Sequence, residues 1–96
     1  RKFMSYVVKC TLRKVDHIDL SPAAMTARND DWKSRTGFLG LKGGITTYFL
    51  FDTAENAYAF EESHRANSDV IGGFPIITVT PLEDADGLTA GDFYIP

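Results

Sequence analysis

The chain has 96 residues, the length of one compact domain, and its 44% hydrophobic and 24% charged residues exclude a disordered or collagen-like protein. Ten Lys and Arg against thirteen Asp and Glu give a net charge of −3 without a basic stripe, which disfavours nucleic-acid binding. No run approaches the roughly 18 apolar residues of a membrane-spanning helix, and the single Cys10 excludes an internal disulfide. We therefore expect a cytoplasmic protein with no membrane segment.

The first two predicted elements are a strand and a helix. Apolar side chains occupy the even positions from Met4 to Leu12, a period of two that predicts a half-buried strand. Ser21 followed by Pro22 is typical of a helix N-cap and first helical position, and predicts a helix over 22–35. The apolar stripe of this helix is thin, and Trp32, the only tryptophan, is expected to anchor it on the sheet.

A hairpin is predicted next, with strands over 36–42 and 45–51. The Gly43-Gly44 pair between them can take the positive φ angles of a tight turn. A two-residue turn of this kind would set Phe38 opposite Phe49.

The remaining elements are a helix, a strand and a tail. Asp52, with Glu55 three residues on, resembles a capping box and predicts the start of a second helix. A last strand is predicted from Ile76 to Thr80. The acidic segment 83–96 is expected to be a loop or an extra edge strand.

The order strand, helix, strand, strand, helix, strand indicates the α+β class and the ferredoxin-like βαββαβ fold. We expect a four-stranded antiparallel sheet with both helices on one face. The domain would span residues 4–82, followed by the tail at 83–96.

In this fold one face of the sheet lies beneath the helices and the other is open, and side-chain alternation sorts the residues between them. Because the second helix follows Phe51 directly, Phe51, Phe49 and Ile45 are assigned to the helix side. The open face then carries the candidate interaction residues Val7, Lys9, Leu39, Leu41, Tyr48, Leu50 and Ile76. A contiguous apolar patch on a sheet usually marks an interface. In the alternative arrangement, residues 82–96 fold back over the sheet and make the patch part of the core.

The stretch 45–60, ITTYFLFDTAENAYAF, resembles the third strand and second helix of the RNA-recognition motif. The resemblance implies the ferredoxin-like topology and places Tyr48 at one exposed base-stacking position. Thr46 and Val7 stand where the family has its other stacking aromatics. Since stacking contributes roughly 1–3 kcal/mol per base, the resemblance implies the fold rather than the family's mode of RNA binding.

No residue pattern indicates catalysis, a metal or a cofactor. His17 lies between Asp16 and Asp19, but this spacing matches no metal motif and fits a solvated loop. Cys10, on the buried side of the first strand, is expected to be an inert core thiol, and His64 a packed histidine of the second helix. We therefore expect no catalytic residue, no metal ligand and no cofactor.

These features favour a small non-enzymatic protein-binding or regulatory module, which uses the open sheet face to bind another protein or a second copy of itself. One alternative is a small-molecule-binding enzyme of dimeric α+β-barrel type, in which two packed sheets enclose the polar groups of Lys9, Arg13, Tyr48 and Thr78. Another alternative is a weak single-stranded RNA binder that uses Tyr48.

Overall fold

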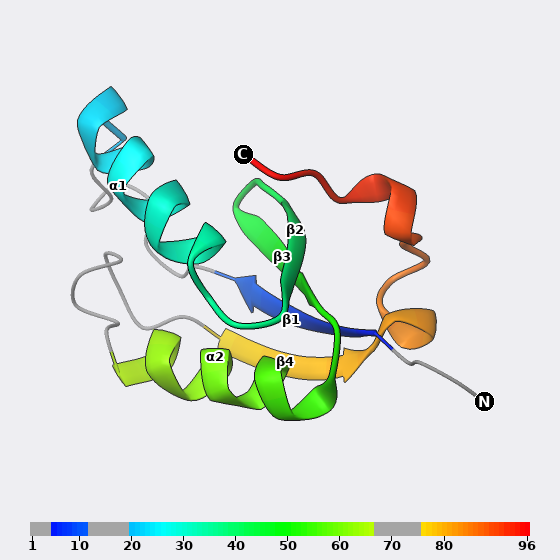
Figure 1. Ribbon diagram of the computed structural model, residues 1–96. Helices are drawn as coiled ribbons and strands as arrows, with labels where there is room; N and C mark the ends of the chain where they lie inside the picture. The colour runs from blue at the N-terminus through cyan, green and yellow to red at the C-terminus, as the bar shows by residue number, and fades with distance from the viewer. Residues whose placement is uncertain (1–4, 12–19, 67–75) are drawn as a thin grey trace.

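The computed structural model describes residues 5–11, 20–66 and 76–96, and places its elements in the predicted order (Figure 1). These are β1 (Tyr6–Thr11), α1 (Pro22–Lys33), β2 (Phe38–Lys42), β3 (Thr46–Phe51), α2 (Ala54–Ala66) and β4 (Ile76–Pro81), followed by two 3₁₀ helices (Leu82–Asp84 and Ala90–Asp92). The chain is therefore an α+β protein. Within the described ranges, neither α-helix is long and apolar enough to cross a membrane.

Side-chain caps mark the starts of both α-helices. The Ser21 hydroxyl accepts a 3.3 Å hydrogen bond from a backbone amide of the first turn of α1, as predicted. The predicted cap of α2 is wrong by one residue. Thr53, rather than Asp52, accepts the hydrogen bond from the Asn56 amide, at 3.2 Å. The Asp52 carboxylate instead accepts a bond from the Asn56 side chain.

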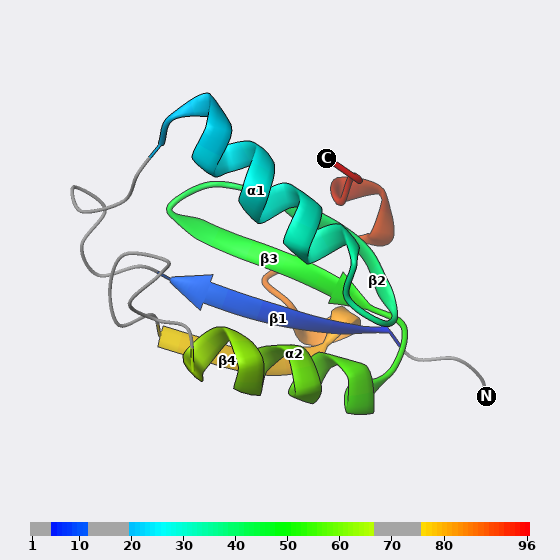
Figure 2. The same ribbon diagram turned by 60° about the vertical axis from the view of Figure 1, so that its left-hand side comes forward.

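The four strands form one antiparallel sheet in the order β2-β3-β1-β4. β1 lies inside the sheet, with β3 on one side and β4 on the other, so β2 and β4 are the edge strands. Figure 2 shows α1 and α2 in front of this sheet.

Aromatic rings fill the core between the sheet and the helices. Phe49 of β3 lies at its centre, with ring-centroid distances of 4.9 Å to Trp32 of α1 and 4.8 Å to Phe60 of α2. Trp32 is thus the anchor of α1, as the sequence predicts. The buried members of this helix-side core are Val8, Cys10, Leu41, Phe49, Phe51, Ala57, Phe60 and Ile77.

The pairing of β2 with β3 differs from the predicted register. Leu41 lies opposite Phe49, and Phe38 lies opposite Phe51, with a β-bulge between Phe38 and Gly40. A two-residue turn would have paired Leu41 with residue 46, so its partner is shifted by three positions. Because an odd shift moves a side chain to the other face, Leu41 packs in the helix-side core instead of on the open face. Ile45, assigned to the helix side, lies in the β2–β3 connection and is exposed.

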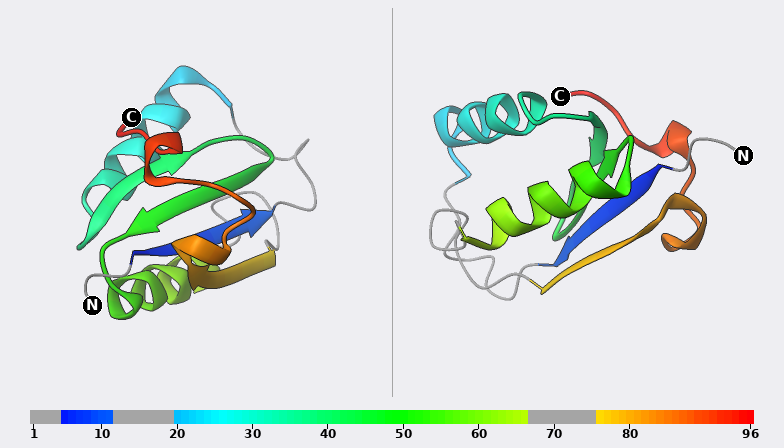
Figure 3. Two further views of the ribbon diagram at one scale, coloured as in Figure 1. Left: turned by 90° about the vertical axis from the view of Figure 1, so that its right-hand side faces the viewer. Right: turned by 60° about the horizontal axis from the view of Figure 1, so that its bottom comes forward.

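The opposite face of the sheet is covered by residues 82–96, called the tail below. In the left view of Figure 3 the tail, drawn in orange and red, crosses in front of the strands while both helices lie behind them. Val7 and Leu50 of the sheet and Ala85 of the tail are buried together and form the tail-side core, and Leu82 and Phe93 of the tail pack against it. The face predicted to be open is therefore closed over its centre, which is the alternative arrangement considered from the sequence.

Candidate functional site

The predicted interaction residues near the middle of the sheet remain together, but beneath the tail. Val7 and Leu50 are buried there. Lys9 and Tyr48 lie beside them, half-buried, on β1 and β3. These four residues do not form a free surface in the folded chain.

The other three predicted residues are separated from that group. Leu41 lies in the helix-side core. Leu39 and Ile76 are exposed, but they belong to β2 and β4, which are the two opposite edges of the sheet. The predicted patch is therefore divided among a covered centre, a core position and two distant edges.

Lys9, Tyr48 and Asp86 form a polar clamp between the sheet and the tail. One Asp86 carboxylate oxygen lies 2.9 Å from the Lys9 ammonium and accepts a 2.8 Å hydrogen bond from the Tyr48 hydroxyl. The hydrogen bond from Lys9, and then that from Tyr48, hold the pKa of Asp86 below its usual value. The same carboxylate raises the pKa of Lys9 and of Tyr48. Because the clamp is partly exposed, solvent screens it, and it positions the tail more than it stabilises the fold.

A cavity of about 430 Å³ lies between α1, the sheet and the β2–β3 connection. Met25 and Trp32 of α1 line one wall, and Leu41 and Phe49 of the sheet line another. The cavity exists because α1 carries mostly short or polar side chains, none of them fully buried. Trp32 is the residue of α1 that packs against the helix-side core.

The mouth of this cavity is rimmed by apolar side chains that face solvent. Leu20 is 69% exposed, Ile45 63% and Tyr94 54%, and all three contribute to the lining. They come from the segment just before α1, the β2–β3 connection and the tail. The fold thus gathers three exposed apolar side chains from distant parts of the chain around one opening.

Cys10 and His64 meet at the inner end of the cavity, where Sγ of the thiol lies 3.4 Å from Nε2 of the imidazole. Burial raises the pKa of Cys10 to about 11. Burial, followed by the positive charge of Arg35, lowers the pKa of His64 to about 4. Both groups are therefore neutral at pH 7. A nucleophilic cysteine needs the opposite shift, toward thiolate, so this pair provides a neutral floor rather than a reactive centre.

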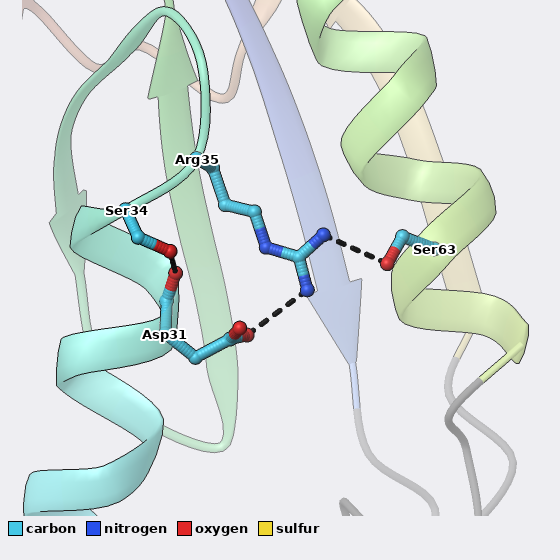
Figure 4. A network of polar contacts seen from close by, with 4 residues as sticks. All are labelled: Asp31, Ser34, Arg35 and Ser63. Atoms are coloured by element: carbon cyan, nitrogen blue, oxygen red, sulfur yellow. Dashed lines mark hydrogen bonds and ion pairs between the residues drawn. The ribbon is translucent and has the colours of Figure 1, made fainter.

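Arg35 links α1 to α2 through its side chain (Figure 4). Its guanidinium donates to the Ser63 hydroxyl of α2 at 2.8 Å and to the Asp31 carboxylate of α1 at 3.0 Å. It also lies over the Phe60 ring, 5.4 Å from the centroid. This arrangement fixes the end of α1 near α2 and supplies the charge that opposes protonation of His64.

Several functional groups were not identified from the sequence. Arg35 and Asp86 act through partners 28 and 38 residues away, and no local pattern marks such pairs. The cavity did have a signal in the sequence, because the apolar stripe of α1 is too thin to fill the space between this helix and the sheet. His17 and Arg13, weighed as candidate site residues, lie outside the described residues. Over the part of the chain that the structure describes, no three His, Cys, Asp or Glu side chains are grouped so as to hold a metal ion.

The arrangement of its elements defines the structural class of the chain. It is a small α+β protein with a four-stranded antiparallel sheet, two helices and a covering tail. No protein-family model, curated protein or solved structure matches the chain.

Proposed function

We propose that the chain is a non-enzymatic protein-binding module of the ferredoxin-like fold, and that an apolar side chain of its partner enters the cavity beneath α1. The element order and the strand order β2-β3-β1-β4 support this fold assignment. The binding site moves, relative to the sequence prediction, from the sheet face under the tail to the helix side.

The observation that carries the proposal is the cavity with its apolar rim. A volume of about 430 Å³ falls within the roughly 300–1,000 Å³ of typical binding sites. Exposed apolar side chains gathered in one place are characteristic of interaction surfaces. Leu20, Ile45 and Tyr94 meet this description at the cavity mouth.

The neutral floor of the cavity supports binding over catalysis. With the pKa of Cys10 raised to about 11 and that of His64 lowered to about 4, neither group is poised for proton transfer near pH 7. An uncharged apolar group is the occupant that suits such a floor, because covering two neutral groups costs far less than covering a charge.

The two alternative functions fit the sheet face less well. A face-to-face dimer would need the surface that the tail crosses. RNA stacking on Tyr48 would place a base beside the Asp86 carboxylate, which accepts the hydrogen bond of the Tyr48 hydroxyl. A negative charge at that position repels the phosphate backbone.

The size of the cavity limits how much it contributes to the free energy of binding. One large apolar side chain removed from water contributes about 1.5–3 kcal/mol. Association costs at least about 4 kcal/mol, so a single buried side chain does not hold a partner by itself. The partner must make further contacts outside the cavity.

Peptides selected by display from a random library against the full chain test the proposal. Asn29→Phe places a ring in the cavity from α1, whereas Thr26→Phe adds the same ring on the exposed side of that helix. We expect selected peptides to shift the emission of Trp32 and to lose about tenfold in affinity for Asn29→Phe but not for Thr26→Phe. Equal affinity for both variants, or failure to select any peptide that changes Trp32 emission, would contradict the proposal.

A further inference from the structure

The outer edge of β2 already carries a short stretch of extended chain. The Leu41 amide donates to the Tyr94 carbonyl at 2.8 Å, and the Tyr94 amide donates to the Leu41 carbonyl at 2.9 Å. This reciprocal pair is the hydrogen-bonded unit of an antiparallel ladder. The tail therefore adds to the edge of the sheet in the way that a bound peptide does.

Gly40 makes this approach possible. A Cβ atom at position 40 would lie 3.1 Å from Cβ of Phe93 and 3.2 Å from the carbonyl oxygen of Tyr94. Both distances are tighter than ordinary van der Waals contact. Any side chain at position 40 would push the added backbone away, so β2 has an edge shaped to receive a main chain.

Residues 93–96 of the tail, which lie beside β2, direct consecutive side chains to opposite faces of the sheet. Phe93 has the extended angles φ −104° and ψ 147° and packs against the tail-side core. Tyr94 and Pro96 line the cavity on the helix side. This alternation is the period of two expected of a strand. The edge and the cavity therefore form one continuous site.

The tail uses little of this edge. Its pairing with β2 is a single-residue bridge at Leu41, although β2 spans five residues. Tyr94 and the following Ile95 remain more than half exposed. A segment that paired along more of β2 would gain main-chain hydrogen bonds that the tail does not make.

We propose that the outer edge of β2 binds an extended peptide segment of the partner protein, which displaces the chain's own residues 93–96. The segment carries an aromatic residue followed by a second apolar residue. The first replaces Phe93 against the tail-side core, and the second enters the cavity in place of Tyr94. The inference rests on the proposed protein-binding function and adds the main-chain contacts that the cavity alone lacks.

The test uses the full chain with Tyr94→Pro, because proline removes the amide that donates to Leu41 and so frees the edge. The probe is a fluorescently labelled nonapeptide with the sequence of residues 88–96, followed by anisotropy. We expect it to bind Tyr94→Pro about tenfold more tightly than the unaltered chain, whose own tail competes. A peptide with proline in place of its tyrosine should not bind. Equal affinity of the nonapeptide for the two proteins would overturn the proposal.

Gly40→Val, added to Tyr94→Pro, identifies the binding site, with the exposed Leu39→Val as the matched control on the same strand. Binding should be lost with Gly40→Val and kept with Leu39→Val. Thermal melts of both double variants establish that they remain folded. Nonapeptide binding that survives Gly40→Val in a folded protein would contradict edge recognition.

Asn29→Phe in the Tyr94→Pro background separates this inference from the proposed function. Binding that is sensitive to both Gly40→Val and Asn29→Phe supports the joint site. Binding that is sensitive to Gly40→Val but indifferent to Asn29→Phe would support the edge and remove the cavity from the proposed function. Nonapeptide binding that is sensitive to Asn29→Phe alone would overturn recognition by the edge of β2 and would leave the cavity as the proposed binding site.

Discussion

On the helix side of the sheet, Phe49 packs between rings from two α-helices, whereas on the other side Leu50 packs beneath a tail whose longest helix has three residues. Both side chains are buried, and they are neighbours on one strand. Burial alone therefore does not distinguish the two faces. The difference lies in the cover: two helices on one face, and an irregular segment held by a polar clamp and one bridge on the other.

Removing the central ring of the helix-side core is expected to have the largest effect. Phe49→Ala deletes the contacts with the rings of Trp32 and Phe60 and leaves a cavity among rigid neighbours. We expect a loss of about 3–5 kcal/mol in the free energy of unfolding. Domains of this size have about 5–15 kcal/mol in total, so the variant should approach the limit of stability. Urea denaturation followed by Trp32 emission measures the loss; a cost below about 1 kcal/mol would show that the ring is not central.

Acid should weaken the helix-side core first. His64 has a pKa of about 4 in the folded chain, against an ordinary value of 6.5 for histidine. A lowered pKa in the folded state means that the unfolded chain binds the extra proton, so stability is lost as the pH falls from 6.5 to 4. The shift corresponds to roughly 3 kcal/mol. Denaturation midpoints measured across this range should fall steeply in the unaltered chain and much less in His64→Gln; equal falls would contradict the role of His64.

Val7 and Val8 provide a matched pair, since they are adjacent on β1, both 0% exposed, and face opposite sides. Val8→Ala should cost about 2 kcal/mol in the free energy of unfolding, because the helix-side core cannot collapse around the missing methyl groups. Val7→Ala should cost about half as much, because the tail can move inward. Equal losses, measured by urea denaturation, would mean that the tail is as rigid a cover as the helices.

The clamp should have the smallest effect, confined to the tail-side face. Asp86→Asn removes the charge that pairs with Lys9, and we expect little change in global stability. Amide hydrogen exchange should quicken at Leu82, whose amide donates to the Ser5 carbonyl, and at Leu88, whose amide donates to the Ala85 carbonyl within the tail. It should not change in β1 or β3. In the unaltered chain the pKa of Asp86 lies below the ordinary value of 3.8 for aspartate, so the clamp is complete above that pH and is lost only at lower pH. Equal exchange in the variant and the unaltered chain would contradict a role for the clamp.

Much of the secondary structure could be predicted because its signals are local. The alternation in β1, the Ser21-Pro22 start of α1 and the sequence of α2 each lie within one element. Errors arose where two local signals competed. Thr53 and Asp52 are both good caps, and the structure uses Thr53.

The β2–β3 register failed for a related reason. Gly43-Gly44 suits a two-residue turn, but the apolar residues of β2 are better buried when Leu41 faces Phe49, and the bulge before Gly40 absorbs the difference. The closing of the second face could be considered from the sequence only as an alternative arrangement, because no local pattern decides it. It depends on Phe93 and Asp86 meeting residues of β1 and β3 that are distant in sequence. The cavity beneath α1 had only a partial signal in the sequence, the thin apolar stripe of that helix, because its shape also depends on how α1 packs on the sheet.

Cys10 has a practical consequence that follows from its burial and its pKa of about 11. An alkylating reagent reacts with the thiolate, and a pKa of about 11 leaves almost none of it in the folded chain at pH 7. Modification by iodoacetamide is therefore slow in the folded chain and becomes faster when β1 separates from its neighbours. The rate at which this thiol is labelled in native buffer therefore reports how often the middle of the sheet opens.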